Sequence, residues 1–175
     1  MTSMNVHTGA IFRVSSKLGK KIRLDYEQTL PPSPNPLLDW SADLFTADRT
    51  QYILLTNTAS LYSLVLYGKG VTNETRLFAD TLAAMRDVMR SDGFLSTFED
   101  VIAPLFYPTA LAKRANRSVI GSMNDLILQA RLRLARNEVS PSDLSFFLNN
   151  TLMSYIDYRA PREDFRSMVR DLLAR

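Results

Sequence analysis

Two apolar segments separated by only four residues constrain the fold more than any other feature of this sequence. Residues 50–56 and 61–67 are rich in Leu, Ile, Val and Tyr, and both are apolar on the two faces of an extended chain. Such segments are typical of central strands. The connection at residues 57–60 is too short for a crossover, so the two strands are predicted to pair as an antiparallel hairpin.

Two further segments extend the predicted sheet. In residues 40–46, apolar side chains alternate with Ser41 and Asp43, which predicts a half-buried strand whose polar face is solvated. The apolar run at residues 10–14 predicts another short strand, followed by a cap at Ser15 and Ser16. We therefore expect a small antiparallel β-meander.

The hydrophobic period changes to that of a helix after residue 70. Cap residues, prolines and glycines mark the ends of the helical segments, as at Asn73, Gly93 and Pro141. We expect five helices, near residues 73–92, 94–103, 118–136, 141–149 and 161–173. The last helix carries an apolar stripe that we expect to close its own core, with pairing to a second copy as the alternative.

These elements predict an α+β protein in which about five helices pack on the sheet. The chain has 175 residues, of which 46% are hydrophobic, so it is long enough for one substantial core. We expect a single domain spanning residues 1–175. Four prolines make residues 28–37 an extended connector, because too little chain precedes them to fold alone.

The residue inventory disfavours several classes of enzyme. The sequence contains no cysteine, and its one histidine, His7, lies near the start of the chain. Ser-His-Asp, Cys-His and zinc hydrolase mechanisms therefore lack a required group, and no cofactor is predicted. No signal-like start or membrane-length apolar segment is present, so we expect a cytoplasmic protein without a membrane partner.

Basic residues are concentrated just before the third predicted helix. Residues 109–137 carry six basic side chains and one acidic side chain, an excess of five, although the net charge of the chain is only +3. Lys113, Arg114 and Arg117 precede Ser118, where the helix is expected to begin. Cations repel the positive end of a helix dipole, whereas anions bind there readily. We expect an anion site, for a phosphate of a nucleotide or nucleic acid, at this helix start.

One flank of the same helix extends the candidate site. At helical spacing, Arg117, Gly121, Asn124, Leu128 and Arg131 fall on one edge beside the apolar stripe. Close packing against Gly121, capping by Asn124 and dipole compensation by Arg131 are the structural alternatives. The predicted ligand-binding residues are Lys113, Arg114, Arg117, Ser118, Gly121, Asn124 and Arg131.

Two alternatives stay open at this point. A metal-dependent phosphoryl-transfer or nuclease-type enzyme would use Asp39, Asp43 or Asp125. The aromatic residues Trp40, Tyr52, Tyr62 and Tyr67 would stack on bases if they faced solvent, although apolar strands more often bury such residues.

The segments LLTNTASLYS and NRSVIGSMNDL, together with FFLNNTLMSYIDYRAPRE, resemble the signature blocks of an uncharacterised bacterial domain family. The resemblance covers nearly the whole chain and implies a single-domain protein of unknown function. It provides no catalytic residues. We therefore expect a binding or interaction module whose partner is a phosphate-bearing ligand or nucleic acid, and which can self-associate through its last helix.

Overall fold

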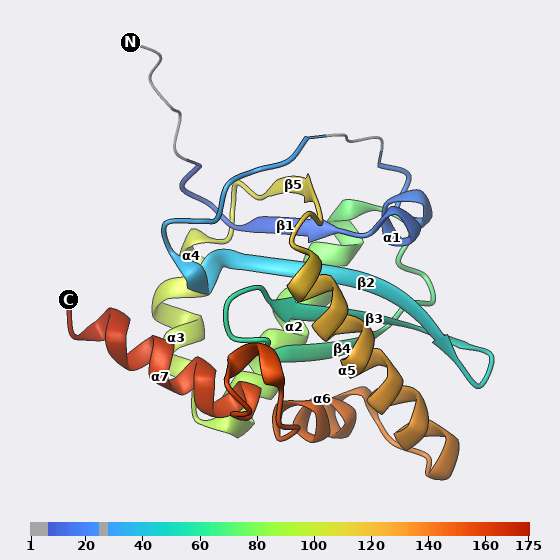
Figure 1. The fold of residues 1–175 in the computed structure, drawn as a ribbon. Coiled ribbons are helices and arrows are strands. Elements are labelled where there is room, and N and C mark those ends of the chain that lie inside the picture. The colour runs from blue at the N-terminus through green and yellow to red at the C-terminus, as the bar shows by residue number, and fades with distance from the viewer. Residues whose placement is uncertain (1–6, 25–27) are drawn as a thin grey trace.

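The computed structural model describes residues 7–24 and 28–175, and a five-stranded sheet lies at its centre (Figure 1). The strand order is β4-β3-β2-β1-β5. The predicted antiparallel meander is confirmed for β2, β3 and β4. The strands are β1 (Ile11–Val14), β2 (Asp39–Ala47), β3 (Thr50–Asn57), β4 (Ser63–Tyr67) and β5 (Ala110–Lys113).

The prediction of a purely antiparallel sheet is wrong. The strand β1 pairs in parallel with both β2 and β5. The helix α1 (Ser16–Lys21) and the proline-rich connector separate β1 from β2, and a connection of this length permits the return that a parallel pair requires. The strand β5 was not predicted because it is only four residues long, and its strand conformation depends on pairing with the distant β1.

Helices cover both faces of this mixed sheet (Figure 1). The predicted helices near 73–92, 118–136, 141–149 and 161–173 are confirmed to within a residue. The segment predicted near 94–103 is also helical: residues 95–105 form one continuous helical run, in which the π-helix lies between two short α-helical pieces. The bounds are α2 (Glu74–Asp92), α3 (Leu95–Thr97), the π-helix η2 (Phe98–Ile102), α4 (Ala103–Leu105), α5 (Arg117–Arg136), α6 (Pro141–Asn149) and α7 (Pro161–Leu173), with 3₁₀ turns η1 (Pro36–Leu38) and η3 (Ser154–Ile156).

Alternation along the strands divides the buried apolar side chains between two cores. Trp40 and Ala42 point into the core beneath α2 and α7, as the sequence pattern predicts. Phe45 and Leu54 point to the other face, where α5 and α6 pack. Trp40 and Tyr62 are fully buried, so they are core residues and not stacking surfaces. Tyr67, by contrast, is exposed.

Both edges of the sheet are covered by groups from other parts of the chain. On β4, Asn149 of α6 accepts from Ser63 N at 2.7 Å and donates to Ser63 O at 2.9 Å, while Ser145 accepts from Val65 N at 2.9 Å. On β5, Lys113 N donates to Gln28 O at 2.9 Å. The backbone groups engaged in this way cannot pair with another chain.

The last helix, α7, covers the core that contains Trp40, as the sequence predicts. Phe165 and Val169 are buried there, and Phe165 stacks on Tyr62 with ring centroids 4.6 Å apart. The Tyr62 hydroxyl donates to Asp92 at 2.6 Å, and Arg162 of α7 also contacts Asp92 at 3.5 Å. Burial and the hydrogen bond with Asp92 raise the pKa of Tyr62, so its hydroxyl stays protonated as a donor. The buried part of the stripe is therefore occupied within its own chain.

No helix in the described ranges is long and apolar enough to cross a bilayer.

Replacing Asn149 tests the edge contact directly. Asn149→Ala leaves the buried N–H and C=O of Ser63 without partners, and we expect it to lower the free energy of unfolding by about 2–4 kcal/mol. Its exposed neighbour makes a matched control: Asn150→Ala removes one surface hydrogen bond and should cost less than about 1 kcal/mol. Urea unfolding measures both values, and equal losses would contradict the assignment.

Candidate functional site

The polar face of β2 is buried, contrary to the prediction that it is solvated. Asp39, Ser41 and Asp43 are 4%, 2% and 3% exposed, and Arg13 of β1 lies on the same face. The alternation of the strand was predicted correctly, but the environment of this face was not. The start of α5 and the connector cover it, and neither contact is visible in the local pattern of β2.

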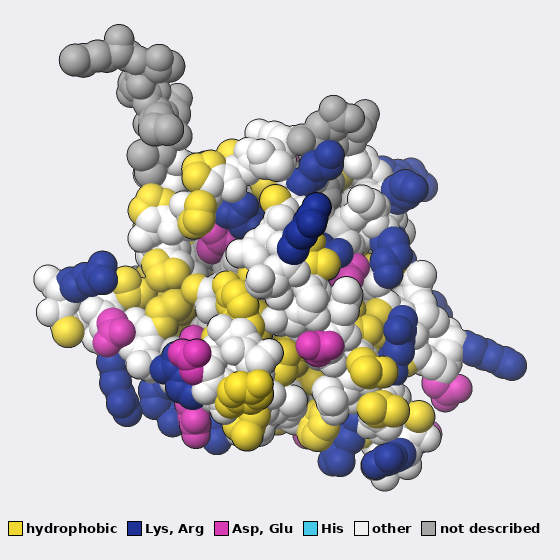
Figure 2. All heavy atoms as spheres, in the orientation of Figure 1, with side chains coloured by type: hydrophobic (Ala, Val, Ile, Leu, Met, Phe, Trp, Pro, Cys, Tyr) yellow, Lys and Arg dark blue, Asp and Glu magenta, His cyan; other side chains and the backbone are white. Residues whose placement is uncertain are grey.

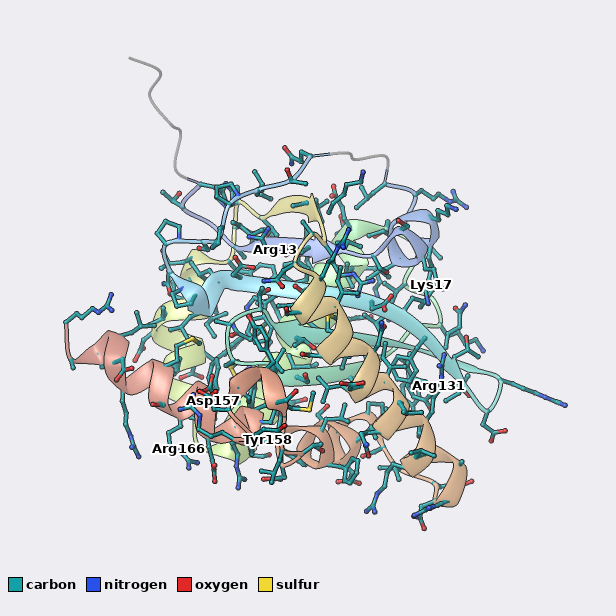
Figure 3. The ribbon with its side chains drawn as sticks, viewed as in Figure 1. Arg13, Lys17, Arg131, Asp157, Tyr158 and Arg166 are labelled. Atoms are coloured by element: carbon teal, nitrogen blue, oxygen red, sulfur yellow. The ribbon has the colours of Figure 1, made fainter. Side chains whose placement is uncertain are left out.

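Arg13 and Asp39 form a bidentate ion pair on this face. Arg13 Nε and Nη2 each lie 2.8 Å from a carboxylate oxygen of Asp39. The same guanidinium donates to the carbonyl oxygens of Leu30 and Pro31, at 2.7 and 2.9 Å, and Ser33 N donates to Asp39 at 2.9 Å. The pair therefore fixes the connector onto the sheet. Figure 3 labels Arg13 beside β1.

A second arginine, Arg114, reaches the same face from the end of β5. Its Nη1 lies 3.3 Å from Asp43 Oδ2, and the Arg114 side chain is 14% exposed. The same Nη1 lies 3.8 Å from the sulfur of Met123. Arg114 Nε is buried and has no hydrogen-bond partner in the described structure. Arg114 is thus less completely satisfied than Arg13.

The two arginines line one cavity of about 340 Å³. The cavity lies between the connector, the β1–β2 face and the start of α5. Hydroxyl groups contribute to its wall, since Ser41 Oγ and Thr58 Oγ1 are 2.9 Å apart. The complete lining is Arg13, Leu30, Pro32, Asp39, Ser41, Thr58, Arg114, Ala115, Asn116, Val119 and Ile120.

The helix α5 begins one residue earlier than expected, which changes its N-terminus. Asn116 is the cap, and its Oδ1 accepts from Ser118 N at 3.0 Å and from Val119 N at 3.2 Å. The expectation that these amides are free to bind an anion is therefore wrong. Asn is a preferred N-cap residue, so the position of Asn116 before the helical period was the signal that could have shown this.

The remaining predicted residues do not converge on the cavity. Lys113 pairs with Val14, whereas Ala112 pairs with Arg13, so Lys113 lies on the opposite face of the sheet from Arg13. Arg117, Gly121 and Asn124 are exposed along one flank of α5, and Ser118 is also exposed. Arg131 is exposed too, and it donates to Thr46 O at 3.1 Å.

Close packing does not explain the glycine in this helix. Apart from its chain neighbours and the backbone of its own helix, a Cβ atom at Gly121 would meet no described atom within 4 Å, so no other element packs closely there. The Asn124 side chain forms no hydrogen bond with another described residue, and its predicted role as a loop cap is likewise unsupported.

Sequence reasoning missed Arg13, which lies at the centre of the site. It is the one charged residue in the otherwise apolar strand Ile11–Val14, and that isolation was the available signal. Only Arg114 of the predicted ligand-binding set lines the cavity.

The three aspartates proposed for a metal site are not gathered into one. Asp39 and Asp43 each contact an arginine, and Asp125 is exposed on α5. Within the part of the chain that the structure describes, no group of three His, Asp or Glu side chains could hold a metal ion.

A known domain family matches most of the chain. The family is described as "Domain of unknown function (DUF6933)", and the match covers residues 11–164. The chain belongs to the DUF6933 family. Among curated proteins, no match was found.

The DUF6933 match includes every residue that lines the cavity. It begins at Ile11, the first residue of β1, and ends at Asp164 in the first turn of α7. The match over residues 11–164 confirms the resemblance to a domain family of unknown function, and the blocks LLTNTASLYS and NRSVIGSMNDL both lie within it. The second block contains Asn116, Val119 and Ile120 of the cavity wall.

A double-mutant cycle tests the buried pair. Asp39→Ala leaves Arg13 buried without its carboxylate, and we expect a loss of about 3–5 kcal/mol in the free energy of unfolding. In the cycle itself, the double variant Arg13→Met, Asp39→Leu should lose less free energy of unfolding than the sum of the losses in Arg13→Met alone and Asp39→Leu alone. The exposed pair Arg76–Asp80 is the control, and Asp80→Ala should cost less than about 0.5 kcal/mol in urea unfolding. Additive losses at Arg13 and Asp39 would show that the two charges do not depend on each other.

Proposed function

We propose that this DUF6933 chain is a binding module whose cavity beside Arg114 takes an anionic group, the phosphate of a nucleotide or nucleic acid. The observation that carries the proposal is the incompletely satisfied guanidinium of Arg114. Arg114 lines the cavity, and its contact with the Asp43 carboxylate is long, at 3.3 Å. Its buried Nε donor has no hydrogen-bond partner in the described structure.

The hydrogen-bonding capacity of Arg114 supports an anionic ligand. A guanidinium has five N–H donors and prefers planar, bidentate acceptors such as carboxylate or phosphate. The polar contacts of Arg114 to described residues all come from Nη1. An unpaired buried donor on a charged group is costly, and a bound oxyanion would reduce that cost. Arg13 differs, since Asp39 and two carbonyl oxygens already accept from it.

Exposed cations beyond the cavity favour a ligand with more than one phosphate. Arg117 is exposed at the first position of α5, and it forms no ion pair within the described residues. In the view of Figure 2, basic side chains extend across the upper and right-hand part of the molecule. Lys17 and Arg131 lie on the right-hand side of the same view in Figure 3. Such a distribution attracts polyanions and makes their binding sensitive to salt.

We favour binding over catalysis at this site. The enzymatic alternative needs carboxylates free to hold a metal, and Asp39 and Asp43 are instead the partners of Arg13 and Arg114. Magnesium-dependent turnover of nucleotides or nucleic acid, abolished by replacing either aspartate, would reverse this preference.

The proposal is tested by removing the cation and its internal partner together. Arg114→Gln alone would leave the buried Asp43 carboxylate without its cation, so the variant combines Arg114→Gln with Asp43→Asn. We expect it to stay folded but to bind pyrophosphate or a short single-stranded DNA roughly thirtyfold more weakly, since a hydrogen bond to a charged group contributes about 2 kcal/mol. Isothermal titration calorimetry measures the affinity, and circular dichroism checks the fold.

Two single variants serve as a matched pair in the same titration. Arg117→Ala should weaken binding and reduce the salt dependence of the affinity for DNA. Lys113→Ala removes the same charge four residues away, on the opposite face of the sheet, and should leave the affinity unchanged. The proposal is wrong if the wild-type protein binds none of these anions, or if the double variant binds them as tightly as the wild type.

A further inference from the structure

A second cavity lies beside the C-terminal end of α5, away from the anion cavity at its start. It has a volume of about 440 Å³ and lies between the β2–β3 turn, the end of β4 and the α5–α6 loop. Figure 1 shows α5 descending toward that side of the sheet. Its lining residues are Asp48, Thr50, Tyr52, Tyr67, Leu134, Asn137, Glu138, Val139 and Ser140, and none of them is basic.

Two carboxylates and the C-terminal end of a helix line this cavity. Asp48 comes from the β2–β3 turn and Glu138 from the α5–α6 loop, and neither forms an ion pair with a described residue. Leu134 and Asn137 mark the C-terminal end of α5, where the helix dipole places partial negative charge. The helix α6 starts in the same loop, but Ser140 caps its Asp143 amide at 3.1 Å. Arg49 follows Asp48 in the turn without lining the cavity.

Two tyrosine rings, Tyr52 and Tyr67, also line the cavity. Phe45, Tyr52 and Tyr67 form a stacked ladder, with centroid distances of 5.4 Å for the first pair and 5.6 Å for the second. Tyr67 ends the ladder and is 55% exposed, so its ring is accessible from the cavity side of the sheet. Burial raises the pKa of Tyr52, and nearby Tyr67 and Asp48 raise it further, although hydrogen bonding with Thr50 opposes the shift. The phenol of Tyr52 therefore stays neutral.

We infer that this second cavity binds an organic cation, either a methylated ammonium or a guanidinium group. Aromatic faces attract such weakly hydrated cations, and adjacent carboxylates strengthen that attraction. A hard metal ion would need a cage of several oxygen ligands, whereas only two carboxylates line this cavity and no group of three carboxylate or histidine side chains among the described residues could hold a metal ion. The inference is independent of the anion cavity, because the two cavities share no lining residue.

The test compares a cation with its neutral isostere. Choline and 3,3-dimethyl-1-butanol have nearly the same shape, but only choline is charged. In ¹H–¹⁵N correlation spectra of the full chain, we expect choline to shift the amide signals of Tyr67, Glu138 and Val139 in a saturable way. Methylguanidinium should shift the same signals, and the neutral alcohol should not.

Variants of Tyr67 and Asp48 separate charge recognition from simple occupation of the cavity. Tyr67 is half exposed, so Tyr67→Leu should fold normally yet weaken choline binding roughly fivefold, the loss expected for one cation–π contact. Tyr67→Phe keeps the ring and should retain the affinity, whereas Asp48→Asn should lower it. Equal binding of choline and the alcohol, unchanged affinity in Tyr67→Leu, or the absence of saturable shifts with either cation would overturn the inference.

Discussion

The buried ion pair between Arg13 and Asp39 joins three parts of the chain that are otherwise far apart in sequence. It links β1 to β2, which are neighbours in the sheet, and the same two side chains hold the connector through Leu30, Pro31 and Ser33. Removing two charges from water is expensive, and only near-complete hydrogen bonding offsets that cost. Here Arg13 satisfies one carboxylate and two carbonyl groups. The parallel half of the sheet and the wall of the candidate site both rest on this arrangement.

The sheet also depends on side chains that protect its edges. Asn149 and Ser145 occupy the backbone groups of β4, and Gln28 occupies part of β5. An unprotected edge would offer its N–H and C=O groups to another chain. Helix α6 therefore contributes Leu144 and Leu148 to the core on the α5 side of the sheet. Its buried polar residues Ser145 and Asn149 bind the backbone of the edge strand β4.

The two ends of α5 differ in the chemistry around them. Arg114, Asn116 and Arg117 lie at its start, whereas Asp48 and Glu138 flank its end with two tyrosines. The start thus gathers cations despite the positive end of the helix dipole, whereas Arg133 and Arg136 in the last turn complement the negative end. Cations at the start do not stabilise the helix, which is why we interpret the start in terms of an anionic ligand. The carboxylates near the far end come from the neighbouring turn and loop, and together with the tyrosines they line the second cavity.

The sequence by itself determined the local elements. The hydrophobic period, the helix-cap residues and the prolines and glycines located the meander, the helix from Glu74 to Asp92 and the helices beginning at Pro141 and Pro161. These signals act between residues that are close in the chain. It also pointed to the start of α5 as the candidate site. Tertiary structure alone decided that β1 pairs in parallel, that ALAK forms β5 and that the polar face of β2 is buried. It likewise placed Lys113 on the opposite face of the sheet from the cavity and brought Arg13 and Arg114 to the same cavity wall. These outcomes depend on contacts between distant segments, which local sequence patterns do not encode.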